Sequence, residues 1–224
     1  MKLEYVVSKE IKELGILSTV VAEIYGVNIE RKDDRLEELK RETASEVIAM
    51  SDEFIEKNPV LQSYRDLVKN TGRSLRKFPP AAESLILSVR RTGRFPLINV
   101  AVDSYNLVVA KRFLALGVHD MNTLGRKITF RLSNGQEPFT AVGSEKLKYT
   151  QPNDFVYADE NRVLAWLDSK DSELVKISLD TKDMVVIIQG THYTTREYNR
   201  AAAEEACELI TRFCGGTYEI QEVV

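Results

Sequence analysis

The pattern of hydrophobic and polar positions predicts helices through the first half of the chain and strands through most of the second. Residues 15–29 are rich in β-branched side chains and bounded by glycine, which is typical of a strand. Residues 33–57 open on two aspartates that suit a helix start and end before Asn58–Pro59, so we expect one charged helix there. The other helices expected in this half are residues 60–70, 81–91 and 96–110.

From about Arg126 onward, apolar residues alternate with polar ones as they do in half-buried strands. Turn residues such as Asn134–Gly135 separate the alternating segments. Thr194-x-x-Glu197 is a capping box for a helix that ends at Gly215–Gly216. The expected strands are residues 127–133, 137–142, 155–158, 163–167, 174–179, 184–189 and 217–224.

Helices that come first and strands that come later predict an α+β fold, with the helices packed on a mixed, mostly antiparallel β layer. A chain of 224 residues fits a single domain, 1–224. We divide it into an N-terminal strand-helix extension, residues 1–58, and a core, residues 59–224. No apolar run reaches the ~18 residues of a membrane span, and the first residues are too polar for a signal peptide. We therefore expect a cytoplasmic protein without a membrane partner.

One of the expected helices carries a polar stripe. Residues 95–110 are apolar on nearly every side, as in a buried helix, yet Asn99, Asp103 and Asn106 interrupt them at spacings of four and three. On a helix these side chains form a single line, and a buried carboxylate between two amides is costly unless partners satisfy it. The stripe is therefore either a structural polar pin or one wall of a binding site. Asn99 also suits the N-cap position of this helix.

Further motifs follow the stripe in a fixed order. They are Gly117-Val-His-Asp120, Ile128-Thr-Phe-Arg131, Asn134-Gly-Gln-Glu-Pro-Phe139 and Phe155-Val-Tyr-Ala-Asp159. This order resembles the B3/B4 domain of the phenylalanyl-tRNA synthetase β subunit, and more closely the free-standing B3/B4 proteins, over roughly residues 60–215. In the synthetase this domain is the editing site. The resemblance therefore implies the B3/B4 fold and the hydrolysis of a wrongly attached amino acid, chiefly tyrosine, from the 3′ end of tRNA.

The resemblance also implies roles for particular residues. Asp103, Asn106 and His119 would act as catalytic residues that position the attacking water and the amino acid. The substrate-binding residues that it implies are Asn99, Asp120, Arg131, Glu137, Asp159 and Thr181. From the residues alone, other roles stay open: Asp103 as the partner of an arginine such as Arg131, and His119 as a loop residue whose neighbour Asp120 caps the next turn.

The chain departs from the synthetase pattern at two positions. Where the editing site carries a histidine this sequence has Gly117, and His119 stands where a phenylalanine is expected. Where the synthetase has a glutamate that recognises the tyrosine hydroxyl, the nearest residue is Gln189. These departures favour a second hypothesis beside a free-standing editing hydrolase: a module that binds tRNA, another RNA or a small ligand and keeps the fold without the hydrolysis.

The distribution of charge singles out the middle of the chain. The net charge is −3, yet residues 65–131 hold 13 Lys and Arg against 4 Asp and Glu, and both flanking segments are acidic. A basic stretch suits a phosphate-bearing partner such as the tRNA acceptor end or an aminoacyl-tRNA. The alternative is that these residues form solvated helix faces balanced by acidic neighbours. The residues expected to contact RNA are Arg73, Arg76, Lys77, Arg90, Arg91 and Arg94.

The sequence predicts neither a metal nor a cofactor. Cys207 and Cys214 lie seven residues apart on one expected helix, about 10 Å along its axis, which exceeds disulfide geometry and indicates reduced packing residues. The two cysteines and two histidines lack the spacing of metal ligands. No nucleophile elbow, phosphate-cradling loop or dinucleotide fingerprint is present. This fits the hydrolysis of an already reactive ester as well as it fits a binding module.

Overall fold

The computed structural model describes residues 3–223. Its helices are α1 (Lys9–Glu13), α2 (Asp34–Ala49), α3 (Asp52–Lys57), α4 (Pro59–Asn70), α5 (Ala81–Thr92), α6 (Val100–Arg112) and α7 (Arg196–Cys214). Its strands are β1 (Glu4–Val7), β2 (Thr19–Tyr25), β3 (Leu116–Asp120), β4 (Lys127–Asn134), β5 (Pro138–Thr140), β6 (Leu147–Tyr149), β7 (Pro152–Ala158), β8 (Val163–Trp166), β9 (Lys170–Asp171), β10 (Met184–Gln189) and β11 (Thr217–Glu222). Two short 3₁₀ helices are η1 (Met121–Thr123) and η2 (Glu173–Val175).

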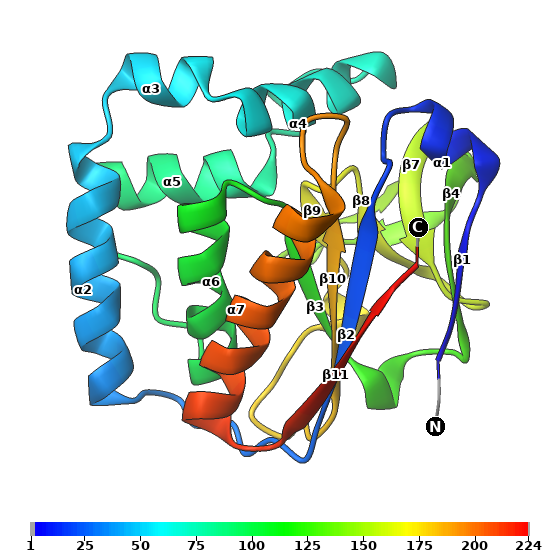
Figure 1. The fold of residues 1–224 in the computed structure, drawn as a ribbon. Helices are drawn as coiled ribbons and strands as arrows, with labels where there is room; N and C mark the ends of the chain where they lie inside the picture. The colour runs from blue at the N-terminus through cyan, green and yellow to red at the C-terminus, as the bar shows by residue number, and fades with distance from the viewer. Residues whose placement is uncertain (1–2, 224) are drawn as a thin grey trace.

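The elements form three layers (Figure 1). The central layer is an antiparallel sheet with the strand order β11-β2-β10-β3. α6 and α7 cover one face of this sheet, and a five-stranded sheet of order β1-β4-β7-β8-β9 lies on its other side. In the second sheet β1 and β4 pair in parallel, whereas its other pairs run antiparallel. The predicted α+β fold, with helices packed on a mixed and mostly antiparallel β layer, is confirmed.

Three strands of the central sheet are covered on both faces, which explains their composition. β3 and β10 are buried throughout, and β2 is buried up to its last residue. Strands that are buried on both faces are continuously apolar rather than alternating. β2 pairs with β10 on one side and with β11 on the other, so the N-terminal segment shares this sheet with the rest of the chain. The boundary at residue 58 stays a prediction.

The helical layer matches most of the expectations. α4, α5 and α6 correspond to the helices expected at residues 60–70, 81–91 and 96–110. Cys207 and Cys214 are free and buried on α7, and burial raises the pKa of each thiol to about 12. Within residues 3–223, no helix combines the length and the apolar composition that crossing a membrane requires.

The single helix expected at residues 33–57 is wrong. α2 ends at Ala49 because Met50 adopts an extended conformation. α3 then begins after Ser51, whose hydroxyl accepts the backbone N–H of Phe54 at 3.1 Å. Serine is a favoured N-cap residue, so this short break starts a second helix in a new direction.

Two boundaries in the second half of the chain also differ from the expectation. Residues 174–179 are not a strand: η2 covers their beginning, and Leu174 and Leu179 are exposed to solvent rather than packed in a sheet. The N-cap of α7 is Thr195 rather than Thr194, because the Thr195 hydroxyl accepts the N–H of Tyr198 at 3.1 Å. The Thr194 hydroxyl closes the preceding turn instead.

A buried ion pair fastens α2 to α6. Lys40 and Asp103 are shielded from solvent, and Nζ of Lys40 lies 2.6 Å from Oδ2 of Asp103. The same ammonium group lies 2.6 Å from Oε1 of Glu37, which is on the preceding turn of α2. The second carboxylate oxygen, Oδ1 of Asp103, accepts the backbone N–H of Ile98 at 3.0 Å. Lys40 therefore neutralises a carboxylate that would otherwise be buried without a counter-charge.

Removal of this ammonium group should destabilise the protein strongly. We expect Lys40→Met to lower the free energy of unfolding by about 3 kcal/mol, because an uncompensated buried charge costs roughly 3–5 kcal/mol. Urea unfolding at neutral pH measures the difference. The exposed pair Lys57–Glu53 supplies the control, since Lys57→Met should change stability by less than about 1 kcal/mol. Equal losses in the two variants would contradict a structural role for the buried pair.

Candidate functional site

Two residues of the polar stripe, Asn99 and Asp103, make structural contacts. Asn99 is the N-cap of α6, and its Oδ1 accepts the backbone N–H of Val102 at 3.0 Å. Asp103 is held by Lys40 and by the N–H of Ile98, and burial raises the pKa of its carboxyl above the ordinary range. The alternatives of an N-cap for Asn99 and a polar pin for Asp103 are therefore both confirmed.

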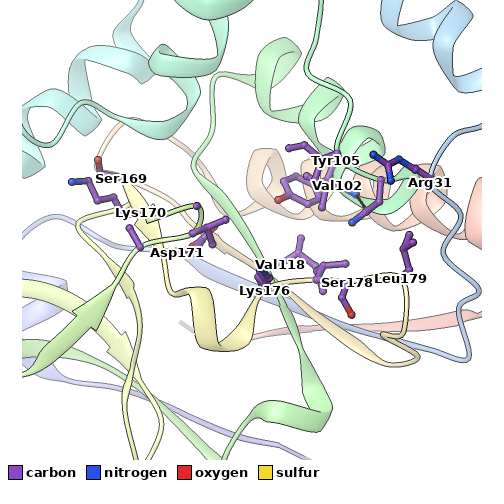
Figure 2. Close-up of a pocket in the computed structure, with 16 residues that line it drawn as sticks. Arg31, Val102, Tyr105, Val118, Ser169, Lys170, Asp171, Lys176, Ser178 and Leu179 are labelled. Atoms are coloured by element: carbon purple, nitrogen blue, oxygen red, sulfur yellow. Dashed lines mark hydrogen bonds between the residues drawn. The ribbon is translucent and has the colours of Figure 1, made fainter. Parts of the chain in front are cut away.

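A cavity of about 660 Å³ opens beside the start of α6 (Figure 2). Ile98 and Val102 near the start of α6, Val118 of β3 and Leu179 form part of its apolar walls. Asn99 is the residue of the stripe that lines it, whereas Asp103 and Asn106 lie outside the lining, and their catalytic role stays a prediction. The charged residues of the lining are Arg31, Lys170, Asp171 and Lys176.

Three polar groups converge on Gly117 beside the cavity. A β-carbon at this position would overlap the hydroxyl of Tyr157, and would stand 3.2 Å from Nε2 of His119 and 3.4 Å from Oδ1 of Asp171. The Tyr157 hydroxyl and Nε2 of His119 are themselves 3.2 Å apart. Gly117 and His119 belong to β3, Tyr157 to β7 and Asp171 to β9, so these four residues, the inter-sheet cluster, join the two sheets. Because Gly117 has no side chain, the Tyr157 hydroxyl can pack directly against the backbone at this position.

Burial sets the protonation of this cluster. It raises the pKa of Asp171 to about 7, although a hydrogen bond with Tyr157 opposes the shift. It lowers the pKa of His119 to about 3, so the imidazole is neutral at physiological pH. The pKa of nearby Asp168 is held well above its usual range, first by burial and then by the charge of Asp171. Asp171 is therefore a cavity-lining group that titrates near neutrality, as general acids and bases do.

The turn that presents Asp171 has an uncommon backbone. Leu167 and Asp168 have φ angles of 58° and 43°, in the left-handed region that side chains other than glycine seldom adopt. The carbonyl of Asp168 accepts the N–H of Ala81 at 3.1 Å, and the Ser169 hydroxyl donates to the carbonyl of Pro79 at 2.7 Å. The start of α5 therefore holds the turn, and such residues concentrate at functional sites.

His119 lies within β3, opposite Val185 of β10, so its expected position in a loop is wrong. The preceding segment pairs with β10 as far as Asp120, and the turn begins only at η1. The His119 ring is fully buried and contacts the edge of the Tyr157 ring. It is connected to the cavity through Tyr157 and Asp171, and its catalytic role stays a prediction.

Three of the residues expected to bind substrate take part in local turns outside the lining. Asp120 accepts the N–H of Asn122 at 2.9 Å, which confirms the alternative in which it caps the next turn. It also accepts the hydroxyl of Thr181 at 2.6 Å. Asp159 accepts the N–H of Gly125 at 2.9 Å and two N–H groups of its own turn. Substrate contacts of these residues remain predictions.

Arg131 pairs with Glu137 and not with Asp103. Its Nη1 and Nη2 lie 3.0 and 2.5 Å from the two carboxylate oxygens of Glu137, and the pair lowers the pKa of that carboxyl. The Ser133 hydroxyl also donates to Glu137. The alternative in which Asp103 pairs with Arg131 is wrong, because Lys40 of α2 is the partner of Asp103. Arg131 and Glu137 lie outside the cavity lining, and their substrate contacts stay predictions.

The six basic residues expected to contact RNA fall into two groups. Arg73 forms a bidentate ion pair with Asp154, with distances of 2.6 and 2.5 Å, and Arg90 lies 2.5 Å from Asp52. Acidic neighbours therefore balance the charge of both arginines, in agreement with the alternative to RNA binding. The exposed residues without an ion pair in residues 3–223 are Arg76, Lys77, Arg91 and Arg94. These four keep the charge that an RNA contact needs.

The residues that matter most in the cavity carried little signal in the sequence. Asp171 lies in a short polar segment that resembles an ordinary turn, and Arg31 lies in the segment before α2 with other charged residues. Tyr105 is on the same helix as the stripe and lines the cavity, whereas Asp103 is not part of the lining. The signal available for Tyr105 was its position next to Asn106 in the family motif.

The comparison with known protein families agrees with the resemblance. The family model of the B3/4 domain matches residues 63–215. A crystal structure of an N-terminal fragment of the phenylalanyl-tRNA synthetase β subunit from Pyrococcus horikoshii aligns with a TM-score of 0.49 and 12% identity, over 100% of this chain and 55% of that one. The chain thus spans about half the length of that fragment. No curated protein matches the sequence. The family match covers most of the chain, which belongs to the B3/4 domain family.

Proposed function

We propose that the chain is a hydrolase that removes a mischarged amino acid from tRNA, with the cavity beside α6 as its acyl-binding site. The proposal rests on one observation: among the described residues, a cavity with apolar walls has Asp171 as its lining carboxylate, with a pKa of about 7. Membership of the B3/4 domain family and the resemblance to the synthetase editing domain favour this reaction.

Hydrolysis of an aminoacyl ester needs a positioned water, a proton acceptor and a polarised carbonyl group. In this proposal the apolar walls bind the amino acid side chain, and ionised Asp171 takes a proton from the attacking water. The Tyr157 hydroxyl orients the carboxylate. Asn99 uses its amide oxygen as the helix cap, so its amide nitrogen is left to donate to the carbonyl oxygen. Asp171 then returns the proton to the departing ribose oxygen.

Two of the three residues that the resemblance implies as catalytic act indirectly in this scheme. Asp103 holds the N–H of Ile98 and so fixes a wall of the cavity. His119 orients the Tyr157 hydroxyl through the 3.2 Å contact between them. Asn106 is half-buried outside the lining and takes no part.

A binding module without hydrolysis is the second candidate. The neutral state of His119 favours it, because a buried imidazole with a pKa of about 3 leaves Asp171 without a second base of similar strength. The exposed cations on and near α5 would serve binding of the RNA equally well in the two candidates.

Deacylation of mischarged tRNA tests the proposal directly. On a panel of tRNAs mischarged with apolar and aromatic amino acids, we expect release of at least one amino acid. Asp171→Asn should slow that release about 100-fold or more, because a positioned base contributes ~10²–10⁴-fold. Asp66→Asn, which alters a solvated pair on α4, should leave the rate unchanged. If no member of the panel is hydrolysed above background, the binding module is the better description.

The pH dependence of the rate should report the ionisation of Asp171. The base acts when ionised and has a pKa of about 7, so kcat/KM should rise as the pH passes upward through that value. Tyr157→Phe removes a hydrogen bond that favours the ionised carboxylate, so the midpoint should move to higher pH. Profiles of both proteins measure the shift. A wild-type profile that is flat from about pH 5.5 to 8.5 would exclude Asp171 as the base.

Binding of uncharged tRNA should depend on the cations at the C-terminal end of α5, Arg91 in its last turn and Arg94 just after it. We expect the double variant Arg91→Ala/Arg94→Ala to weaken binding and to reduce the slope of log affinity against log salt by up to about 2, because each lost phosphate contact reduces it by about 1. Mobility-shift titrations at several salt concentrations measure the slope. Lys9→Ala/Lys12→Ala on α1, on the opposite side of the molecule (Figure 1), is the charge-matched control. Identical slopes in both variants would show that Arg91 and Arg94 do not contact RNA.

A further inference from the structure

The segment outside the B3/4 match contributes a residue to the cavity. The match begins at residue 63, yet Arg31 lines the cavity from the connection between β2 and α2. The backbone is fixed at this point, because the carbonyl of Glu30 accepts the N–H of Val100 at 3.0 Å. The ion pair between Lys40 of α2 and Asp103 of α6 also holds these two helices together. The position of Arg31 beside the start of α6 is therefore determined by specific contacts.

Arg31 also differs from the other cations of the lining. Lys176 is paired with Glu173, and Nζ of Lys170 lies 4.7 Å from the centre of the Phe78 ring. In residues 3–223 no carboxylate lies within ion-pair distance of Arg31, whose side chain is exposed. Its guanidinium is thus available to an anion, and the planar fork of an arginine matches two oxygens of a phosphate group.

The surroundings of Arg31 favour negative charge. Asn99 lines the same cavity and is only 4% exposed, and its amide nitrogen donates no hydrogen bond within residues 3–223. The N-terminus of α6, which Asn99 caps, adds a partial positive charge. Figure 2 places Arg31 at one end of the cavity, beside Val102 and Tyr105, and Asp171 with its neighbours toward the other. A ligand that fills the cavity therefore meets a cation at one end and the titrating carboxyl at the other.

We propose that Arg31 binds a phosphate group of the nucleotide that carries the acyl group, while the acyl group itself lies beside Asp171. This inference rests on the proposed function and adds the residue that distinguishes an acyl group on a nucleotide from a simple ester. Arg31 lies outside the matched B3/4 region, so this selectivity belongs to the N-terminal segment of the chain.

A pair of stable ligands tests the role of Arg31 without any need for turnover. The probes are 3′-deoxy-3′-aminoacylamino-adenosine carrying phenylalanine, with and without a 5′-phosphate, and calorimetry measures their affinities. We expect the phosphate to strengthen binding to the wild type about tenfold or more, as a charge-assisted hydrogen-bonded pair does. Arg31→Ala should abolish this gain and leave the affinity for the phosphate-free probe unchanged. Arg31→Lys should keep part of the gain.

A variant at a second arginine distinguishes a direct contact between Arg31 and the phosphate from an effect of overall charge. Arg41→Ala removes the same charge from an exposed position on α2 and should retain the full gain from the phosphate. A gain that survives Arg31→Ala, or the absence of any gain in the wild type, would overturn the inference while the deacylation test still decides the proposed function. If neither probe binds, both the inference and the assignment of the cavity as the acyl site fall. Deacylation that fails while the phosphate gain depends on Arg31 would leave the inference standing in a binding module.

Discussion

The geometry of the cavity depends on how one buried charge is neutralised. The carboxylate of Asp103 shares its two oxygens between the ammonium group of Lys40 and the backbone N–H of Ile98. The first contact fixes α2 against α6, and the second fixes the residue that forms a wall of the cavity. Separation of the two helices would leave the carboxylate without its counter-charge, which is among the costliest defects that a protein interior can have. The same pair therefore holds the fold and shapes the site.

The residues that hold the cavity in position and the residues that titrate come from different layers of the molecule. The helical layer supplies rigid positions: Asn99 as a cap, Asp103 as a pin and Arg31 on an anchored backbone. The titrating group comes from the β layers, where Asp171, Tyr157 and His119 meet over Gly117. The synthetase pattern has a histidine at the position of Gly117, whereas here a tyrosine hydroxyl from the opposite sheet occupies that space.

Local features of the fold were predictable from sequence, because caps, breaks and buried runs depend on neighbouring residues. The residue type of Asn99 and its place before an apolar run indicate an N-cap, and apolar composition indicates the buried strands β2 and β10. The break at Ser51 gives no such signal, because Met50 continues an otherwise helical pattern. The inter-sheet cluster could not be predicted, since Gly117, Tyr157 and Asp171 come from three strands whose pairing and stacking no local pattern encodes. Asp171 in particular has the neighbours of an ordinary turn residue.

The electrostatics of the cluster bear on which chemistry the cavity can support. Burial removes His119 as a base at neutral pH and places the proton equilibrium of Asp171 at about pH 7. Burial, and then the charge of Asp171, hold the pKa of the neighbouring Asp168 carboxyl well above its usual range. One carboxylate is a modest catalytic apparatus, yet an aminoacyl ester is a reactive substrate whose hydrolysis is limited mainly by the placement of water and carbonyl. In the proposed function, a rigid cavity with one base whose pKa is about 7 suits such a substrate, and the cavity walls and Arg31 would determine its selectivity.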